Sequence, residues 1–570
     1  MDGPQTQQGS VAEAFLCSLK RHGIDYVLAN AGTDFAPVIE ALVSLAGRGE
    51  AAPQFITVPH ENLAVAMAHG YYQIAGKPAA VMVHVTVGTG NTVCALMNAA
   101  RDNVPLLLMA GRTPHTQSGH IASRNAPIHW GQEHFDQAGI VREYTKWDYE
   151  LRAGQSVDEI LGRALDIAQS EPRGPVYLTL PREVLADPAR PPERALPPTD
   201  LAAPQPSASH IEAIAKLVAR AEWPMIVTSN LGRDRAAVAT LAALADKHAI
   251  PVVQPHPSCT NLPASHAMNL GHAGVELLGK ADVIVVADCE VPWFPRYFTP
   301  RDDVQVVHLG VDPLWAGYPI RLFPAHIAVP GSSRTALQLL DEALRTGGAN
   351  QNAAKRRRGA IQEFKESKAR EKAALLARAR TEKPISYAYL GECVRAALPK
   401  KAIVVTELGV SADSLELEEP GSLLGVSIGG GLGFGLGASL GAKLAARDRT
   451  VVATIGDGSY MFGNPTPFHL VSRAASLPTL TIICNNGRWQ AVESATRAVY
   501  PQGLAAAAKP MPLVELQPSP EFTKVAEASD AWTRRVDEPA DLPRAIEAAL
   551  ASVADGRQAL LDVRMEHGVR

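Results

Sequence analysis

The segment from Gly456 to Asn486 constrains the fold of this chain more than any other. An apolar run at residues 450–455 ends in Gly-Asp-Gly, a helix-length stretch comes next, and a second apolar run at residues 480–484 ends in Asn-Asn. Two short apolar runs separated by a helix predict parallel strands of an α/β sheet. The carboxyl ends of such strands meet at one sheet edge, where α/β proteins bind ligands. We therefore expect a carboxylate and an amide side by side at that edge.

The same alternation of apolar strands and amphipathic helices runs through the whole chain. A length of 570 residues is too great for one hydrophobic core. A Pro- and Ala-rich stretch at residues 186–210 and a charged helical stretch at residues 346–383 divide the chain. The prediction is an α/β protein of three doubly wound parallel-sheet domains at residues 1–185, 211–345 and 384–570. The expected strands are 26–29, 55–58, 80–84, 106–110, 176–180, 225–228, 251–254, 283–287, 304–309, 402–406, 451–455, 480–484 and 559–563.

Composition excludes several classes of function. A net charge of −4 gives no electrostatic reason to bind nucleic acid or a membrane surface. No apolar stretch has transmembrane length, and the polar first ten residues are unlike a signal peptide and are expected to form a tail. The six cysteines are scattered, without a CxxC pair, which favours buried free thiols over disulfides or zinc. We expect a cytoplasmic protein.

The Gly-Asp-Gly turn has a definite chemistry. Hard oxygen ligands beside backbone N–H groups suit a Mg²⁺ ion that carries a diphosphate. The glycines let the backbone approach phosphate oxygens closely. An ordinary strand–helix–strand crossover with polar loops would give the same pattern, so the motif alone leaves both interpretations open.

Residues 456–486 resemble the thiamin-diphosphate motif of the superfamily that contains pyruvate decarboxylase, benzoylformate decarboxylase and acetolactate synthase. The resemblance extends over nearly the whole chain. It implies that the side chains of Asp457 and Asn486 and the backbone carbonyl of Arg488 hold the metal. The 29-residue spacing (486 − 457) is longer than is usual in the family. We expect the extra residues at 462–465, before the intervening helix.

The first domain contains a matching signal. Glu61 follows an expected strand and begins a helix, where a glutamate also simply favours the helix dipole. The resemblance implies that Glu61 is catalytic, because the family's glutamate at this position hydrogen-bonds the aminopyrimidine of the cofactor and drives its acid–base chemistry.

Residues 84–91 (HVTVGTGN) follow the next expected strand, and Gly-Thr-Gly-Asn there suits a tight turn with exposed backbone donors. This segment is most similar to benzoylformate decarboxylase. The similarity implies that His84 relays protons beside the substrate and that Thr33 replaces a substrate-facing serine; a purely structural histidine is the alternative. A second histidine is expected near residues 293–299 but is missing, so either Tyr297 substitutes for it or the substrate differs.

A glycine cluster opens the segment at residues 427–445. Small residues there also permit close helix packing, and a dinucleotide loop is disfavoured because no strand is expected directly before the cluster. The resemblance implies that Leu432 bends the cofactor and that the Gly430 carbonyl binds its amino group. It further implies diphosphate contacts at Gly409, Gly458 and Ser459. Pocket-lining candidates are Gln132, His134, Trp489 and Gln490.

The resemblance implies an enzyme that uses thiamin diphosphate and Mg²⁺ on small 2-oxo acids and on aldehydes or ketones. We expect non-oxidative decarboxylation or carboligation to 2-hydroxyketones. An acetolactate synthase-type transferase with FAD, a 2-hydroxyacyl-CoA lyase and a non-catalytic subunit stay open as alternatives. A nicotinamide-dependent oxidoreductase is disfavoured by the lack of a well-placed GxGxxG. Because the family's site lies between subunits, a homodimer is the minimum and a homotetramer is expected.

Overall fold

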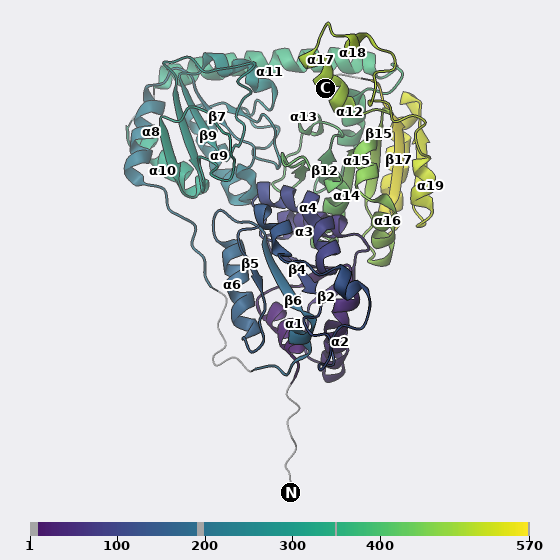
Figure 1. The fold of residues 1–570 in the computed structure, drawn as a ribbon. Coiled ribbons are helices and arrows are strands. Elements are labelled where there is room, and N and C mark those ends of the chain that lie inside the picture. Colours follow the sequence, from purple (N-terminus) through teal and green to yellow (C-terminus); the bar gives the residue numbers. More distant parts are fainter. Residues whose placement is uncertain (1–8, 191–198, 348–349, 568–570) are drawn as a thin grey trace.

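The described part of the chain forms three parallel sheets, each with helices around it (Figure 1). The computed structural model describes residues 9–190, 199–347 and 350–567. Most of the expected tail, and part of the linkers expected at 186–210 and 346–383, therefore lie outside the described residues. The three-domain α/β architecture predicted from the sequence is confirmed, and the domain boundaries stay predictions.

The first sheet has the parallel strand order β2-β1-β3-β4-β6-β5. Its strands are β1 (Tyr26–Ala29), β2 (Gln54–Thr57), β3 (Ala80–Val83), β4 (Leu107–Arg112), β5 (Asp148–Glu150) and β6 (Val176–Pro181). Its α-helices are α1 (Val11–Arg21), α2 (Ala36–Arg48), α3 (Glu61–Ala75), α4 (Val85–Arg101), α5 (Ile128–Gly131), α6 (Val157–Gln169) and α7 (Arg182–Ala186). The short 3₁₀ turns are η1 (Thr33–Phe35), η2 (Ala138–Ile140) and η3 (Arg142–Tyr144).

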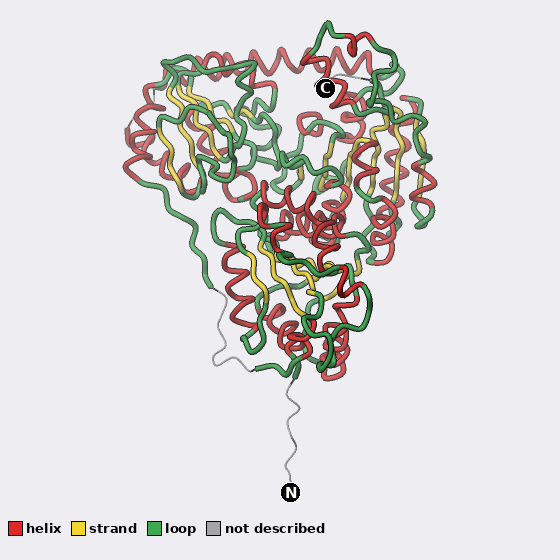
Figure 2. The backbone as a smooth tube through the Cα atoms, in the orientation of Figure 1, coloured by secondary structure: helices red, strands yellow, loops and turns green. Residues whose placement is uncertain are grey.

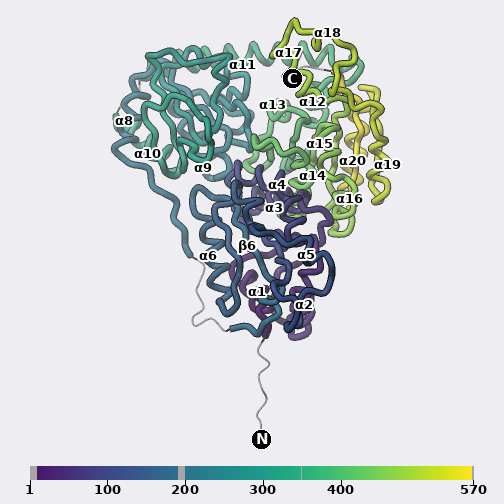
Figure 3. The backbone as a smooth tube through the Cα atoms, viewed as in Figure 1, coloured from purple at the N-terminus to yellow at the C-terminus, as the bar shows by residue number. Residues whose placement is uncertain are grey.

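The middle sheet has the parallel order β11-β10-β9-β7-β8. Its strands are β7 (Pro224–Val227), β8 (Val252–Val253), β9 (Val283–Ala287), β10 (Gln305–Gly310) and β11 (Ile327–Pro330). Around it lie α8 (Ala208–Arg220), η4 (Leu231–Arg233), α9 (Arg235–His248), η5 (Ala273–Lys280) and α10 (Ser333–Gly347). The long helix α11 (Gln351–Ala379) then runs from this domain towards the last one (Figures 1 and 3).

The last sheet has the parallel order β13-β12-β14-β15-β17-β16. Its strands are β12 (Ile403–Glu407), β13 (Leu423–Gly425), β14 (Val451–Gly456), β15 (Leu480–Asn485), β16 (Trp532–Val536) and β17 (Ala559–Arg564). The helical elements are α12 (Tyr387–Ala397), α13 (Ala412–Leu415), α14 (Phe434–Ala445), α15 (Asp457–Phe462), α16 (Pro465–Ala474), α17 (Gln490–Val499), α18 (Leu504–Ala507), α19 (Phe522–Glu527), η6 (Pro539–Asp541) and α20 (Leu542–Ala554).

Both faces of the first sheet are buried, as the continuous apolar strands predict. In β3, Val81 and Val83 belong to one buried cluster, and Ala80 and Met82 belong to another on the opposite face. Helices accordingly lie on both sides of the strands (Figure 2). This is the doubly wound arrangement expected from the sequence.

All the expected strands are present, and the four strands of the described residues that the sequence analysis missed lie at sheet edges. These four are β5, β11, β13 and β16. Three of them are only partly buried, so their residues lack the apolar pattern of a central strand. The fourth, β13, is buried but has only three residues.

The structure corrects four details of the sequence analysis. Ser10 caps α1 in a capping box, so it does not belong to a tail. Residues 85–91 lie inside α4 and form no tight turn. Strand β13 ends two residues before the glycine segment, so the absence of a strand was a wrong reason to reject a dinucleotide loop. None of the six cysteines forms a disulfide, as expected, but Cys94 is exposed and Cys17 is only half-buried.

The first and last domains meet where α3 packs against α14. A Cβ atom built on Gly441 of α14 would lie 1.9 Å from the Met67 carbonyl oxygen, and one on Gly70 of α3 would lie 2.2 Å from the Ala438 carbonyl oxygen. The small side chains in the segment at 427–445 thus permit close helix packing, because only glycine leaves room for the backbones of α3 and α14 to touch.

We predict that Gly441→Ala destabilises the protein by about 1–3 kcal/mol, because the added methyl group forces the two helices apart. The matched control is Gly359→Ala in α11, where a Cβ atom would meet no heavy atom within 4 Å. This control is expected to stabilise by about 0.4–1 kcal/mol. Urea unfolding of both variants measures the difference; equal stability of the two would contradict the close packing.

Candidate functional site

The three candidate catalytic residues of the first domain lie at one edge of its sheet. Thr33 begins η1 after β1, Glu61 begins α3 after β2, and His84 occupies the position between β3 and α4. Strand β1 lies between β2 and β3, so the carboxyl ends of three neighbouring strands deliver these residues. The sequence analysis placed Glu61 and His84 at expected strand ends, and only the family resemblance implied that they share a site with Thr33.

Glu61 is buried, and two amide side chains hold its carboxylate. Asn30 Nδ2 donates to one carboxylate oxygen at 2.9 Å, and Asn91 Nδ2 donates to the other at 3.1 Å. The helix dipole at the start of α3 adds a favourable field for the negative charge. Neither Asn30 nor Asn91 was singled out as a partner of Glu61, because they come from different strand ends and meet only in the fold.

His84 forms a short hydrogen bond with a buried aspartate. Its Nδ1 lies 2.5 Å from Oδ1 of Asp34, and this bond, opposed by burial, raises the pKa of His84. Glycines leave the space for the pair: a Cβ atom on Gly32 would lie 2.0 Å from His84 Nδ1, and one on Gly111 would lie 1.8 Å from Asp34 Oδ2. The pair therefore favours a positively charged imidazole at the sheet edge.

A second histidine that the sequence analysis missed lies beside Thr33. The hydroxyl oxygen of Thr33 is 3.4 Å from Nε2 of His129, which is buried in α5. No motif surrounds His129, so only the fold places it at the site. Of the candidate pocket residues, Gln132 is half-buried and its carbonyl accepts a hydrogen bond from Thr86 at 2.9 Å, whereas His134 is exposed.

The candidate metal ligands of the last domain also lie at neighbouring strand ends. Asp457 follows β14 and Asn486 follows β15, and these two strands pair in parallel with Gly456 opposite Cys484. One Asp457 oxygen accepts from the Gly458 N–H at 2.9 Å, and the other accepts from the Gly487 N–H at 2.7 Å. Burial, opposed by these bonds, raises the pKa of Asp457 to about 6.

The loop after β15 is tightly held. The side-chain oxygen of Asn486 accepts from the Arg488 N–H at 3.0 Å. The Arg488 side chain pairs with Glu493 and Glu515, at 3.2 and 2.8 Å. Arg488 also pairs with Glu515 through the backbone. The break between α15 and α16 falls at Gly463 and Asn464, where the longer spacing predicted extra residues.

These residues fit a Mg²⁺ ion bound together with a diphosphate. Asp457 and Asn486 offer hard oxygen ligands, and the buried Ser459 hydroxyl has no hydrogen-bond partner within the described chain. Among the described residues, no group of three or more His, Cys, Asp or Glu side chains could hold a metal alone. A site with a single carboxylate suits Mg²⁺ that takes its remaining ligands from water and phosphate oxygens.

The two glycine positions proposed near the diphosphate are closely packed. A Cβ atom on Gly409 would lie 2.2 Å from the Thr454 carbonyl oxygen, and one on Gly458 would lie 2.2 Å from the Trp489 ring. Trp489 therefore packs directly on the Gly458 backbone. Larger residues at either position would push the loop away from β14 or from the indole.

The glycine segment is fixed by a buried carboxylate that the sequence analysis did not single out. Glu407, at the end of β12, accepts from the N–H groups of Gly433 and Gly435 at 2.8 and 2.7 Å. Burial raises the pKa of Glu407 to about 7. Of the expected cofactor contacts in this segment, Gly430 is exposed with a φ of +73°, and Leu432 is half-buried.

Helix α4 links the first domain to this segment. Asn98 donates to the Gly431 carbonyl at 2.7 Å and accepts from the Gly431 N–H at 2.9 Å. In the part of the chain that the structure describes, no hydrogen bond or ion pair joins Thr33, Glu61 or His84 directly to the candidate residues of the last domain. The structure thus gathers two half-sites, one at each sheet edge.

The middle domain lacks a histidine at residues 293–299, but His256 reaches this segment from another loop. The ring centroid of His256 lies 5.2 Å from that of Phe294 and 5.9 Å from that of His272. Tyr297, the substitute considered from the sequence, is 73% exposed. The fold, which sequence spacing did not reveal, therefore places His256 beside the expected segment.

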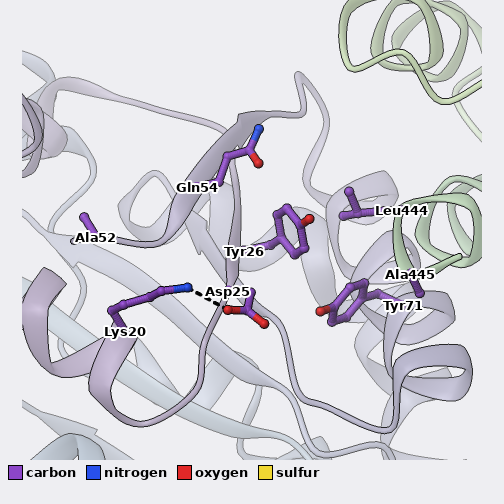
Figure 4. A pocket seen from close by; sticks show the side chains of 8 residues that line it. All are labelled: Lys20, Asp25, Tyr26, Ala52, Gln54, Tyr71, Leu444 and Ala445. Atoms are coloured by element: carbon purple, nitrogen blue, oxygen red, sulfur yellow. Dashed lines mark hydrogen bonds and ion pairs between the residues drawn. The ribbon is translucent and has the colours of Figure 1, made fainter. Parts of the chain in front are cut away.

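Two cavities lie away from these half-sites. One, of about 730 Å³, lies beside the carboxyl ends of β7 and β9, and its lining includes Arg233, Asp234 and Asp288. This mixture of charges identifies no single ligand, so FAD stays an open alternative. The other, of about 350 Å³, lies at the amino ends of β1 and β2, where Lys20 pairs with Asp25 at 2.7 Å (Figure 4).

Comparison with known proteins gives consistent matches along the chain. Residues 9–140, 211–340 and 406–563 match the N-terminal, central and C-terminal domain models of thiamine pyrophosphate enzymes. Benzoylformate decarboxylase of Pseudomonas aeruginosa is 28% identical over 490 residues, covering 83% of this chain and 85% of that protein. Acetolactate synthase of Mycobacterium bovis is 27% identical over 328 residues, covering 55% of this chain and half of that protein.

A solved structure shares the fold. The thiamine diphosphate-dependent 4-hydroxybenzoylformate decarboxylase of Rhodococcus jostii superposes with a TM-score of 0.77 at 22% identity, covering 98% of this chain and 99% of that one.

We predict that Glu407 makes stability fall as pH rises. Its folded pKa of about 7 exceeds the ordinary value of 4.5, so between these values the native state binds more protons than the unfolded state. Stability from this group is therefore complete below about pH 4.5 and is lost as pH rises through 7. Melting temperatures across this range should decline less steeply in Glu407→Gln than in the exposed control Glu366→Gln; parallel slopes would refute the prediction.

Proposed function

Because this chain belongs to the family of thiamin-diphosphate enzymes that includes decarboxylases and acetolactate synthases, we propose that it is a non-oxidative 2-oxo acid decarboxylase or carboligase. The observation that carries this proposal is the presence of two half-sites in one chain: Glu61 at one sheet edge, and Asp457 with Asn486 at another. The proposed products are aldehydes or, when a second carbonyl compound is the acceptor, 2-hydroxyketones.

The residues of the last domain would hold the cofactor's charged end. Asp457, Asn486 and the Arg488 carbonyl would bind Mg²⁺, and Ser459 with Gly458 and Gly409 would face the diphosphate. Gly430 and Leu432 would support the rings. Thiamin diphosphate, when bound, supplies an electron-accepting centre, so that a bond to a carbonyl carbon can break.

The residues of the first domain would manage protons. Glu61, held by Asn30 and Asn91, would hold a proton at the aminopyrimidine. His84, whose charged form is favoured by the hydrogen bond to Asp34, suits recognition of a substrate carboxylate and donation of a proton after the bond breaks. Thr33, exposed at the same edge, would contact the substrate.

The alternatives differ in the step after bond cleavage. Transfer to a second 2-oxo acid would make this chain an acetolactate synthase-type transferase, and cleavage of a 2-hydroxyacyl-CoA would make it a lyase of that class. The longer match with benzoylformate decarboxylase favours decarboxylation.

Among the residues that the structure describes, none of the helices combines the length and apolarity needed to cross a bilayer. A cytoplasmic location remains part of the proposal.

The proposed reaction is tested with a panel of 2-oxo acids and aldehydes, scoring CO₂ and ketol formation with thiamin diphosphate and Mg²⁺. Activity is expected to disappear when EDTA removes the metal. Glu61→Gln should still bind the cofactor but lose about 10²–10⁴-fold in turnover. The exposed control Glu40→Gln should keep wild-type turnover. Wild-type turnover by Glu61→Gln would remove its proposed role.

We also propose a homodimer at minimum, and a homotetramer, with the first domain of one subunit facing the last domain of another. Support comes from the separation of the two half-sites within the chain. Light scattering during turnover is expected to show dimers or tetramers, and activity should fall on dilution below the dissociation constant. A fully active monomer would refute this assembly.

A further inference from the structure

His129 is a buried histidine that the proposed mechanism leaves without a task. It is 3% exposed, lies in the short helix α5, and has no counterpart among the residues singled out in the sequence. Its imidazole lies between the backbone of its own loop and the Thr33 hydroxyl, which belongs to the exposed edge of the site. The two nitrogens therefore face different partners.

The partners of His129 determine which nitrogen carries the proton. The Asn125 backbone N–H points at Nδ1 from 3.1 Å, and a backbone N–H can only donate, so Nδ1 must be an unprotonated acceptor. A neutral imidazole then carries its proton on Nε2, which is the atom 3.4 Å from the Thr33 hydroxyl oxygen. The Nε2–H group can thus donate to Thr33, through a long hydrogen bond.

The charges around His129 favour this neutral form. Burial lowers the pKa of His129, and the positive charges of Arg182, Arg124 and His84 lower it further, with Asp34 opposing them. His84 behaves in the opposite way, because its bond to Asp34, helped by Gln132 and Glu61, raises its pKa. Two histidines at one sheet edge are thus pushed towards different protonation states, a pattern that separates a proton donor from a neutral partner.

A network of arginines fixes the position of His129 relative to Thr33. Arg124 donates to the His129 carbonyl at 2.6 Å and to Glu133 at 2.5 Å. Arg182 donates to the carbonyls of Ala122 and Ser123, on the same loop, and reaches the Thr33 carbonyl at 3.4 Å. The loop that carries His129 and the turn that carries Thr33 are therefore held by a shared guanidinium.

We infer that His129 is a positioning residue: by donating its Nε2 proton to the Thr33 hydroxyl oxygen, it directs the Thr33 hydroxyl proton outward as a hydrogen-bond donor to the substrate. This inference rests on the proposed function, since it assigns Thr33 a substrate contact. His129 itself exchanges no proton in this role. It sets the orientation of a hydroxyl group that would otherwise rotate freely.

Two substitutions separate the two nitrogens of His129. In His129→Gln the side-chain amide can reach the position of Nε2 and still donate to Thr33, whereas in His129→Asn the side chain is too short and retains only the contact with the Asn125 N–H. His129→Asn is expected to lower kcat/KM on the order of tenfold, because one hydrogen bond to Thr33 is lost. His129→Gln should retain most of the wild-type kcat/KM. His115→Asn, at an exposed histidine, is the control.

A double-mutant cycle tests whether the effect passes through Thr33. In a Thr33→Val background, His129→Asn is expected to change kcat/KM less than about twofold, because the hydroxyl that it orients is gone. The limbs of the pH–rate profile should stay where they are in the wild type. An equal loss in both backgrounds, or a displaced limb, would overturn the positioning role.

Nuclear magnetic resonance of protein labelled with ¹⁵N-histidine gives a readout that needs no substrate. Near pH 7 the His129 ring should show the neutral form protonated at Nε2, and the His84 ring should protonate at a higher pH than the His129 ring, with His129→Asn and His84→Asn providing the assignments. A His129 ring protonated at Nδ1 would overturn the inference even in an active decarboxylase. The expected tautomer in a protein inactive on every 2-oxo acid would instead count against the proposed function.

Discussion

The parallel register of β14 and β15 is the constraint on which the candidate site depends. It places Gly456 opposite Cys484, so the next residues of both strands leave the sheet together. Asp457 then closes the edge, because its two oxygens accept N–H groups from both loops. A shift of one residue would turn Asp457 away from the second loop. The cofactor half-site therefore depends on the register of these two strands, which brings its side chains together.

Elsewhere in the molecule, glycines let backbone and side chains approach closely and so position other residues of the candidate site. Gly32 and Gly111 leave the space that His84 and Asp34 occupy, and Gly441 lets α14 touch the backbone of α3. Buried carboxylates then fix what the glycines make room for: Glu407 holds the glycine segment and Asp34 holds His84. Polar groups inside such packing are fully oriented, which is what a site for acid–base chemistry requires.

The sequence located candidate residues best where they directly follow a central, apolar strand. Central strands bury both faces and are continuously apolar, so their ends, and with them Thr33, Glu61, His84, Asp457 and Asn486, could be located. Edge strands such as β16 have mixed exposure and gave no such signal. Gly-Thr-Gly-Asn at residues 88–91 was misread as a turn because glycine and asparagine favour turns locally, whereas packing against the sheet makes this segment helical.

The sequence by itself determined the class of fold, the order of the domains and the residues that come after each central strand, because these depend on apolar periodicity and on short motifs. Only the tertiary structure decided which of these residues meet. Asn91 reaches Glu61 across 30 residues, and His129 reaches Thr33 across 96. Hydrogen bonds between such distant positions leave no pattern in the chain, since each partner is chosen by the geometry of the folded sheet edge and not by its neighbours in sequence.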